Sequence, residues 1–273
     1  MDHLDSRIIR LARMARISPS GARRIVKFRR VACHMGAYLR RRAAARDIQG
    51  TSKWAHFIPR DRGYRLLSHD SLAGSAGVVE SCRELFEAKG GIQSFQMGKK
   101  PFFTNVLEAA DLEARPELLD FILSDPVIES VTGYLGTVPR LNSVGLFVSN
   151  ANESMESSQL FHLDGEDFRM VKCFYNLGHV APENGPFTFL PRDASRRVRK
   201  GLKVETDEGR HEDGDVFQFC DAEEAICLTG PAGQGAFVDT ANCLHFGSRA
   251  RAGYRMVLMF CYCPYPNVKI DKG

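Results

Sequence analysis

Two side chains that could bind a metal ion lie close together in the middle of the chain. His162 and Asp164 stand two residues apart in the segment SQLFHLD. This segment is typical of a β-strand, in which side chains at positions i and i+2 point to the same face. An imidazole nitrogen and a carboxylate oxygen on one face suit a divalent first-row metal ion. A third ligand has to come from a distant segment, and His245 in DTANCLHFGS is the candidate.

The His-x-Asp pattern alone carries little weight, because it occurs three times in the chain. One copy lies at residues 3–5, near the N-terminus, and another at 211–213 in the polar stretch EGRHEDGD, which is typical of a loop. Only the copy at 162–164 lies in an apolar, strand-like segment with a second strand-like segment, residues 168–177, behind it. Its setting therefore favours a metal site.

The composition is that of a globular protein with a substantial core. The 273 residues are 44% hydrophobic and 26% charged, and no run of 18 apolar residues is present to span a membrane. The eight cysteines are scattered, and Cys261 and Cys263 fall on an apolar strand, as buried thiols do. We infer a reducing compartment, with no hydrophobic signal segment, and expect the protein to be cytoplasmic.

The charge is distributed unevenly along the chain. Residues 1–50 hold 13 Lys and Arg against 3 Asp and Glu, which is +10, and the remainder holds 24 against 30, which is −6. Three interpretations of this basic extension stay open. It docks on acidic lipid or nucleic acid, it is a transit peptide, against which Asp2 and Asp5 argue, or it is a surface helix with solvated arginines.

The apolar periodicity divides the rest, residues 51–273, into a helical part and a β-rich part of one domain. Helices are expected at 78–89, at 107–123 with a break near Pro116, and at 126–135 before Gly136. From residue 140 to about 265, short strands separated by turn residues follow. The expected strands are 141–149, 158–164, 168–177, 186–191, 215–219, 225–230, 235–240 and 254–264.

This order of elements predicts an α+β fold that is mainly β, with a helical layer in front of the β-rich part. Seven or eight short strands of this kind are typical of an antiparallel sandwich, and we predict a double-stranded β-helix, the jelly-roll or cupin-like type. The basic run SRRVRKGLK, residues 195–203, is expected to be a loop between two groups of strands. Trp54 is expected to anchor the core.

Two parts of the sequence resemble the phytanoyl-CoA dioxygenase family of Fe(II)/2-oxoglutarate oxygenases. They are VPRLNSVGLFVSN with SSQLFHLDGEDFRMVKCFYNLGHVAPENGPFTFLP, and GQGAFVDTANCLHFGSRARAGYRMVLMF. The resemblance covers roughly residues 90–265 and rests on the His-x-Asp pair, the V-x₂-E-N-G-P turn, and a distal histidine with an arginine ten residues later.

The resemblance implies that His162, Asp164 and His245 bind Fe(II), and that 2-oxoglutarate and O₂ take the open positions. Arg255 would bind the far carboxylate of 2-oxoglutarate, for which a planar, permanently charged guanidinium is suited. The implied reaction hydroxylates a C–H bond of a small molecule and releases succinate and CO₂. The carboxylate of Asp164 argues for hydroxylation over halogenation, because a smaller residue there would admit a halide to the iron.

Further residues are assigned around this centre. Lys172 and Phe174 share one face of their strand, so that Lys172 either assists cosubstrate or substrate binding or faces solvent, and Phe174 would contact substrate. Ser248 would support the cosubstrate carboxylate. Asp239 would orient an imidazole or serve a turn. Surface or structural roles are expected for His34, His56, His69 and His179.

One departure from the family leaves the substrate open. After FTFLP the family has a Gly-Ser-His ending, whereas this chain continues Arg192-Asp193-Ala194-Ser195. The alternative function is a jelly-roll protein that binds a metal or ligand without turnover. Arg255 argues against it, because such a protein needs no second carboxylate clamp.

Overall fold

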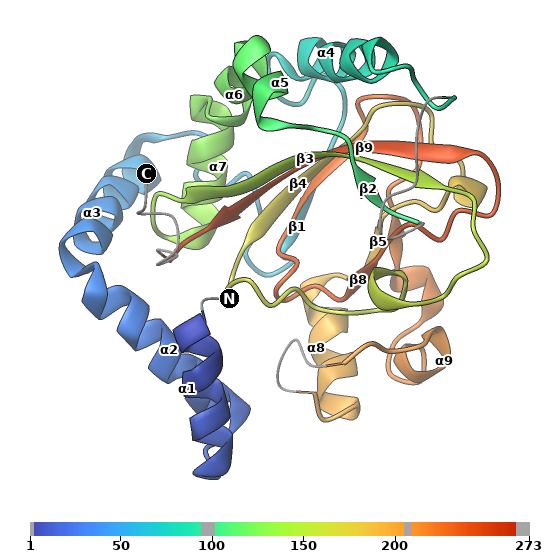
Figure 1. Ribbon diagram of the computed structural model, residues 1–273. Helices are drawn as coiled ribbons and strands as arrows, with labels where there is room; N and C mark the ends of the chain where they lie inside the picture. The colour runs from blue at the N-terminus through green and yellow to red at the C-terminus, as the bar shows by residue number, and fades with distance from the viewer. Residues whose placement is uncertain (1–2, 94–101, 205–208, 266–273) are drawn as a thin grey trace.

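The computed structural model describes residues 3–93, 102–204 and 209–265 and confirms the jelly roll, with two antiparallel sheets facing each other (Figure 1). The larger sheet has the strand order β1-β7-β4-β9-β3-β2, and the smaller has the order β6-β5-β8. The strands of the larger sheet are β1 (Tyr64–Leu67), β7 (Gly235–Val238), β4 (Val171–Asn176), β9 (Tyr254–Cys263), β3 (Arg140–Asn150) and β2 (Thr104–Asn105). Those of the smaller are β6 (Ile226–Cys227), β5 (Thr188–Phe189) and β8 (His245–Phe246).

Strand alternation in the larger sheet separates its core face from its cavity face. In β9, Arg255, Val257 and Met259 line a cavity between the sheets, and the residues between them enter the main core. In β4, Lys172 and Phe174 line the same cavity. The period of two in both strands therefore brings a cationic side chain from each into the interior of the jelly roll.

Helices α4 (Ser75–Ala88), α5 (Ala109–Ala114), α6 (Pro116–Ile122) and α7 (Asp125–Leu135) carry the apolar residues that cover the other face of the larger sheet (Figure 1). Pro116 separates α5 from α6 because proline restricts the residue before it and cannot donate a helical hydrogen bond. Gly136 ends α7 with φ 74°, a left-handed conformation that glycine adopts without strain. The expected helices in this layer are thus confirmed.

Residues 3–50 include α1 (His3–Met14), α2 (Pro19–Cys33) and most of α3 (Met35–Thr51). Arg41 of α3 ties them to the β-rich part, because its side chain donates to the carbonyls of Val138 at 2.7 Å and Pro264 at 2.8 Å. In α2, buried Arg30 lies 3.8 Å from Asp167. No helix among the described residues is both long and apolar enough to cross a membrane. The division of the chain at residue 50 stays a prediction.

Three expected elements differ from the structure. The segment 158–164 is not a regular strand. It begins in a short 3₁₀ turn, η1 (Ser157–Gln159), and continues in two isolated bridges, Phe161 with His211 and His162 with His245. The basic run at 195–203 lies mainly in helix α8 (Arg192–Gly201), whose Ala194, Ser195 and Val198 are buried on one face.

The segment 215–219 is wrong as a strand, because its first residues end the short helix α9 (Asp213–Val216), and Val216 is buried beside α8. Strand β1 lies before the first expected helix, where no element was predicted, and β2 lies between two of the expected helices. Two further 3₁₀ turns, η2 (Pro182–Asn184) and η3 (Ala222–Glu224), complete the elements. Trp54 is half-buried against the main core, as expected of an anchor.

Candidate metal centre

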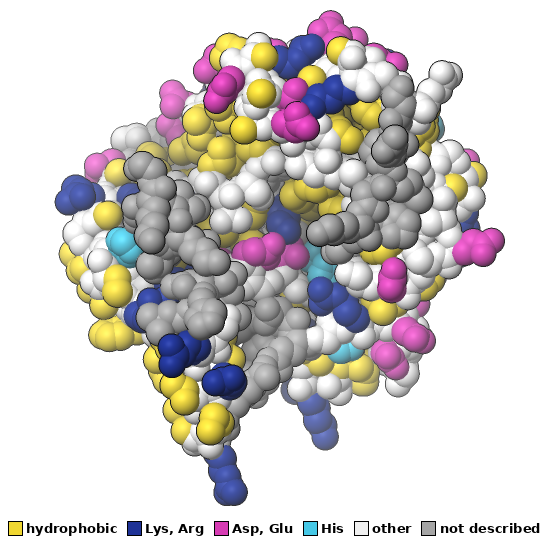
Figure 2. Space-filling model, viewed as in Figure 1, with side chains coloured by type: hydrophobic (Ala, Val, Ile, Leu, Met, Phe, Trp, Pro, Cys, Tyr) yellow, Lys and Arg dark blue, Asp and Glu magenta, His cyan; other side chains and the backbone are white. Residues whose placement is uncertain are grey.

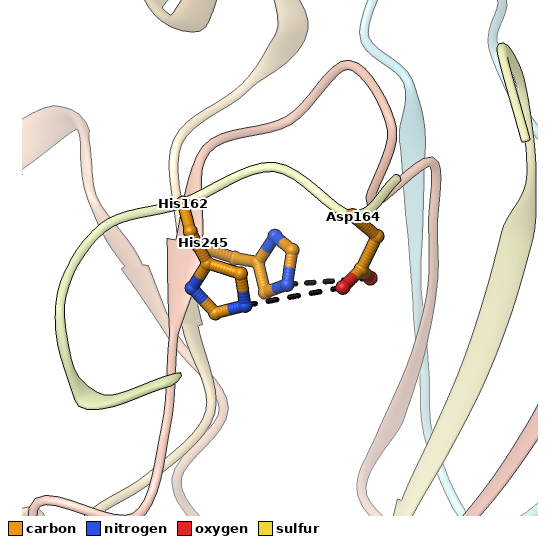
Figure 3. A group of neighbouring side chains, drawn as sticks. All are labelled: His162, Asp164 and His245. Atoms are coloured by element: carbon orange, nitrogen blue, oxygen red, sulfur yellow. Dashed lines mark ion pairs between the residues drawn. The ribbon is translucent and has the colours of Figure 1, made fainter. Parts of the chain in front are cut away.

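His162, Asp164 and His245 converge as the sequence predicts. Their ligand atoms all lie within 4.8 Å of one another, and within the described residues no other group of three or more His, Cys, Asp or Glu side chains meets this criterion. The Asp164 carboxylate lies 3.9 Å from Nε2 of His162 and 3.5 Å from Nε2 of His245. Figure 3 shows both rings directing this nitrogen toward the carboxylate. Three ligands so placed can bind one face of an octahedral metal ion.

Backbone hydrogen bonds bring these distant residues together. The amide of His162 donates to the carbonyl of His245 and the reverse bond also forms, both at 3.0 Å. The amide of Asp164 donates to the carbonyl of Thr240 at 2.9 Å. The predicted convergence is therefore right although the regular strand expected to produce it is not present.

The other nitrogen of each imidazole is held by a backbone carbonyl. Nδ1 of His162 lies 2.9 Å from the oxygen of Leu160, and Nδ1 of His245 lies 3.0 Å from that of Cys243. A carbonyl only accepts, so each Nδ1 carries the proton and each Nε2 keeps its lone pair for a metal. The sequence could not predict these partners, because every residue has a backbone carbonyl and no residue type marks the one that accepts.

Burial keeps both imidazoles neutral, the form that binds metal. Burial, followed by the neighbouring His245, lowers the pKa of His162 to about 3. Burial likewise lowers the pKa of His245 below its ordinary value. Desolvation disfavours the charged imidazolium, so the two rings enter the centre as neutral donors.

Lys172 faces the cavity and not solvent, and its partner is the carboxylate of Asp164, one of the three candidate ligands. Its Nζ lies 2.7 Å from Oδ2 of Asp164 and 3.7 Å from Glu166. Burial alone would raise the pKa of Asp164, but the positive charge of Lys172 outweighs it and holds that pKa well below the usual range. Asp164 is therefore ionised before any metal arrives.

Arg255 is a buried cation whose charge no described residue neutralises. Nη2 donates to Oγ of Ser248 at 3.3 Å, and that hydroxyl lies 2.8 Å from Oγ of Ser149. Among the described residues, Nε and Nη1 of Arg255 have no hydrogen-bond partner. Burial lowers the pKa of Arg255 to about 10. A buried guanidinium left in this way is costly, and an incoming carboxylate would satisfy it bidentately.

One cavity of about 330 Å³ contains the three candidate ligands, Lys172 and Arg255. Its wall includes Phe174, whose ring stacks on that of Phe187 with the centroids 4.0 Å apart; contact of Phe174 with substrate stays a prediction. Charged and histidine side chains surround a hollow near the centre of the face in Figure 2. The sequence analysis assigned no role to four further lining residues: Phe103, Phe147, Glu166 and Arg210.

The remaining predicted residues lie outside the centre. Asp239 accepts from the hydroxyl of Tyr134 at 2.6 Å and from Asn242 at 2.9 Å, so it supports a turn and orients no imidazole. Asp213 pairs with Arg249 at 2.8 Å, and His211 bridges Phe161, so this His-x-Asp copy is structural. As expected for surface or structural positions, none of His34, His56, His69 and His179 is buried.

Comparison with protein-family models and with curated proteins found no match. Solved structures do match. EctD from S. alaskensis with bound Fe has a TM-score of 0.53 at 15% identity, over 78% of this chain and 76% of that one. The same protein with 2-oxoglutarate and 5-hydroxyectoine matches with a TM-score of 0.53 at 13% identity, over 78% and 75%. AviO1 from Streptomyces viridochromogenes Tue57 matches at 0.51 and 14% identity, over 83% and 97%.

These likenesses show the fold. At such identities they support the jelly roll, and membership of the phytanoyl-CoA dioxygenase family stays a prediction. What EctD binds is a property of EctD, and its bearing on this chain depends on whether the residues at the centre fit the same groups.

Proposed function

We propose that this chain is an Fe(II)- and 2-oxoglutarate-dependent oxygenase that hydroxylates a C–H bond of a small molecule. The observation that carries the proposal is the buried, uncompensated guanidinium of Arg255 in the same cavity as a group of two histidines and one carboxylate. A metal-binding protein without turnover needs the two histidines and the carboxylate but does not need the uncompensated guanidinium. EctD, which has this fold, was solved with Fe and with 2-oxoglutarate.

Each residue has a task that its surroundings support. His162, Asp164 and His245 would hold the iron, with both rings fixed by backbone carbonyls. Arg255 and Ser248 would bind the far carboxylate of 2-oxoglutarate. With both groups and O₂ bound, the centre supplies an oxidant able to hydroxylate a C–H bond, with release of succinate and CO₂.

The other cavity residues place the substrate and exclude water. The stacked rings of Phe174 and Phe187 present an apolar wall beside the ligands, which suits a C–H group. Lys172 is already engaged with Asp164, so we assign it to the metal carboxylate instead of to the cosubstrate. Asp164 would occupy a coordination position and leave no halide site there, which supports hydroxylation.

Anaerobic titration of the protein with Fe(II) and then 2-oxoglutarate tests the proposal. We expect the weak visible absorption band of an iron–keto acid chelate, which requires two adjacent open positions on the metal. The band should be lost in His245→Ala and kept in His179→Ala, a matched variant of an exposed histidine. Iron binding without any band in the unmodified protein would favour the non-catalytic jelly roll.

A further inference from the structure

The three N-terminal helices expose an unusual amount of apolar surface. The described residues include twelve exposed large hydrophobic side chains, and seven lie between residues 11 and 39. Met14 is 75% exposed, Phe28 72% and Leu11 57%. Scattered exposed apolar residues need no explanation, but a concentration of them marks an interaction site.

These side chains form a stripe on the outward side of α2 and α3. Ile25 and Phe28 lie three residues apart in α2, Met35 and Leu39 lie four apart in α3, and all four are exposed. Ala22, Val26 and Arg30 of α2 are buried, and so is Ala45 of α3. Residues three or four apart lie on the same face of a helix, so each of the two helices packs inward with one side and presents an apolar pair on another side to the outside.

The surface around this stripe is strongly basic. Residues 1–50 carry a net charge of +10, and Arg24, Lys27, Arg40 and Arg42 are exposed beside the stripe. Their long side chains can extend past the apolar residues and place their charges farther out. Apolar and cationic groups are thus presented together.

We propose that α1, α2 and α3 dock this protein on the surface of a bilayer containing anionic lipids. Helices that lie in the headgroup region bury an apolar face while flanking Lys and Arg contact lipid phosphates. The exposed Leu, Met, Ile and Phe side chains suit the first contact, and the +10 charge suits the second.

Two other occupants fit this surface less well. Nucleic acid would attract the arginines but would give Phe28 and Leu39 no apolar surface to contact, because its backbone binds proteins through electrostatic contacts. A second copy of the chain would cover the apolar stripe but would bring one +10 surface against another, which opposes association. Charge complementarity therefore favours an anionic bilayer.

Side chains of α3 attach the docking helices to the β-rich part of the chain. Arg41 donates two hydrogen bonds across to Val138 and Pro264, and Tyr38 stacks on Tyr265 at 5.9 Å. The exposed residues of the stripe take no part in these contacts. The inference is independent of the proposed oxygenase activity.

Sedimentation of the full chain with lipid vesicles tests the proposal. We expect binding to vesicles of equal parts phosphatidylglycerol and phosphatidylcholine, weak binding to phosphatidylcholine alone, and loss of binding at high salt. Phe28→Ser with Leu39→Ser should lower the partition coefficient at least about tenfold, because two apolar side chains no longer leave water. Leu66→Ser with Leu123→Ser, which changes exposed apolar residues elsewhere, is the matched control and should bind unchanged.

Three results would overturn the proposal. Undiminished vesicle binding by the Phe28→Ser, Leu39→Ser variant, with its fold checked by circular dichroism, would show that the stripe does not contact lipid. A dimer in light scattering that this variant dissociates would assign the stripe to a second copy. Binding to duplex DNA that exceeds vesicle binding and is unchanged in the variant would assign the surface to nucleic acid.

Discussion

Replacing Lys172 with Met should destabilise the metal-free protein strongly and the metal-loaded protein only slightly. Lys172 Nζ lies 2.7 Å from Asp164 Oδ2, and each side chain is only 12% exposed. Removing it leaves a nearly buried carboxylate facing two neutral imidazoles. A bound divalent cation would supply the missing positive charge.

The expected size follows from this burial. Removing one partner of a buried ion pair costs about 3–5 kcal/mol of unfolding free energy, and the slight exposure of this pair favours the lower value, about 3 kcal/mol. For a chain of this size that is a fall in Tm of about 6–12 °C. With metal bound, the loss should shrink to that of a solvent-exposed pair, about 1 kcal/mol or less. The difference, about 2 kcal/mol, means that the metal should bind the variant roughly thirtyfold more tightly.

The assay is thermal unfolding of chelator-treated and Mn(II)-loaded protein, together with calorimetric titration of Mn(II). Lys89→Met is the matched control, because Lys89 lies 2.7 Å from Asp111 in a more exposed pair outside the cavity, with Lys89 31% exposed. Its effect should be small and the same with and without metal. An equal loss of Tm in both states of Lys172→Met, or weaker Mn(II) binding, would refute the linkage between this ammonium and the metal.

Two other changes should have measurable consequences. Arg255→Met should weaken 2-oxoglutarate binding to the Mn(II)-loaded protein by about thirtyfold or more, because it removes charged hydrogen bonds worth about 2 kcal/mol or more; calorimetry that finds an unchanged affinity contradicts the assignment. Burial raises the pKa of Asp167 to about 7 against the opposing charge of Arg30. Between about pH 4 and 7 the folded protein therefore keeps Asp167 protonated while the unfolded chain has lost that proton. Over this range the free energy of unfolding falls as the pH rises. Asp167→Asn should therefore gain stability relative to the unmodified protein between pH 5 and 8 in urea unfolding, and a constant difference would contradict that pKa.

Sequence periodicity was sufficient for the fold wherever an element has one buried face along its length. Strand β9 alternates between the cavity and the core, and α7 begins with proline in its first turn and ends at Gly136, so both were predictable. Helix α8 was not, because five of its ten residues are Arg or Lys and the small buried residues Ala194 and Ser195 give little apolar signal.

The site could be predicted where it depends on residue type and not where it depends on backbone. The two histidines, Asp164 and Arg255 have side chains with distinct chemistry, so spacing and resemblance were enough to find them. The carbonyls of Leu160 and Cys243, which fix the imidazoles, carry no such signal. The ion pair between Lys172 and Asp164 needed the pairing of distant segments, since an alternating strand places Lys172 on a face without saying what lies opposite.

The charges in the cavity predict that metal and 2-oxoglutarate bind cooperatively. Asp164 and Lys172 balance each other and Arg255 is left uncompensated, while Glu166 and Arg210 supply opposite charges among the other lining residues. A divalent cation alone therefore enters a cavity that already has an excess of positive charge, and the 2-oxoglutarate dianion cancels what the metal adds. Coupling between two ligands is reciprocal, so Mn(II) should bind more tightly when 2-oxoglutarate is present, and Arg255→Met should reduce that gain. Equal Mn(II) affinity with and without 2-oxoglutarate would show that the two do not share this cavity.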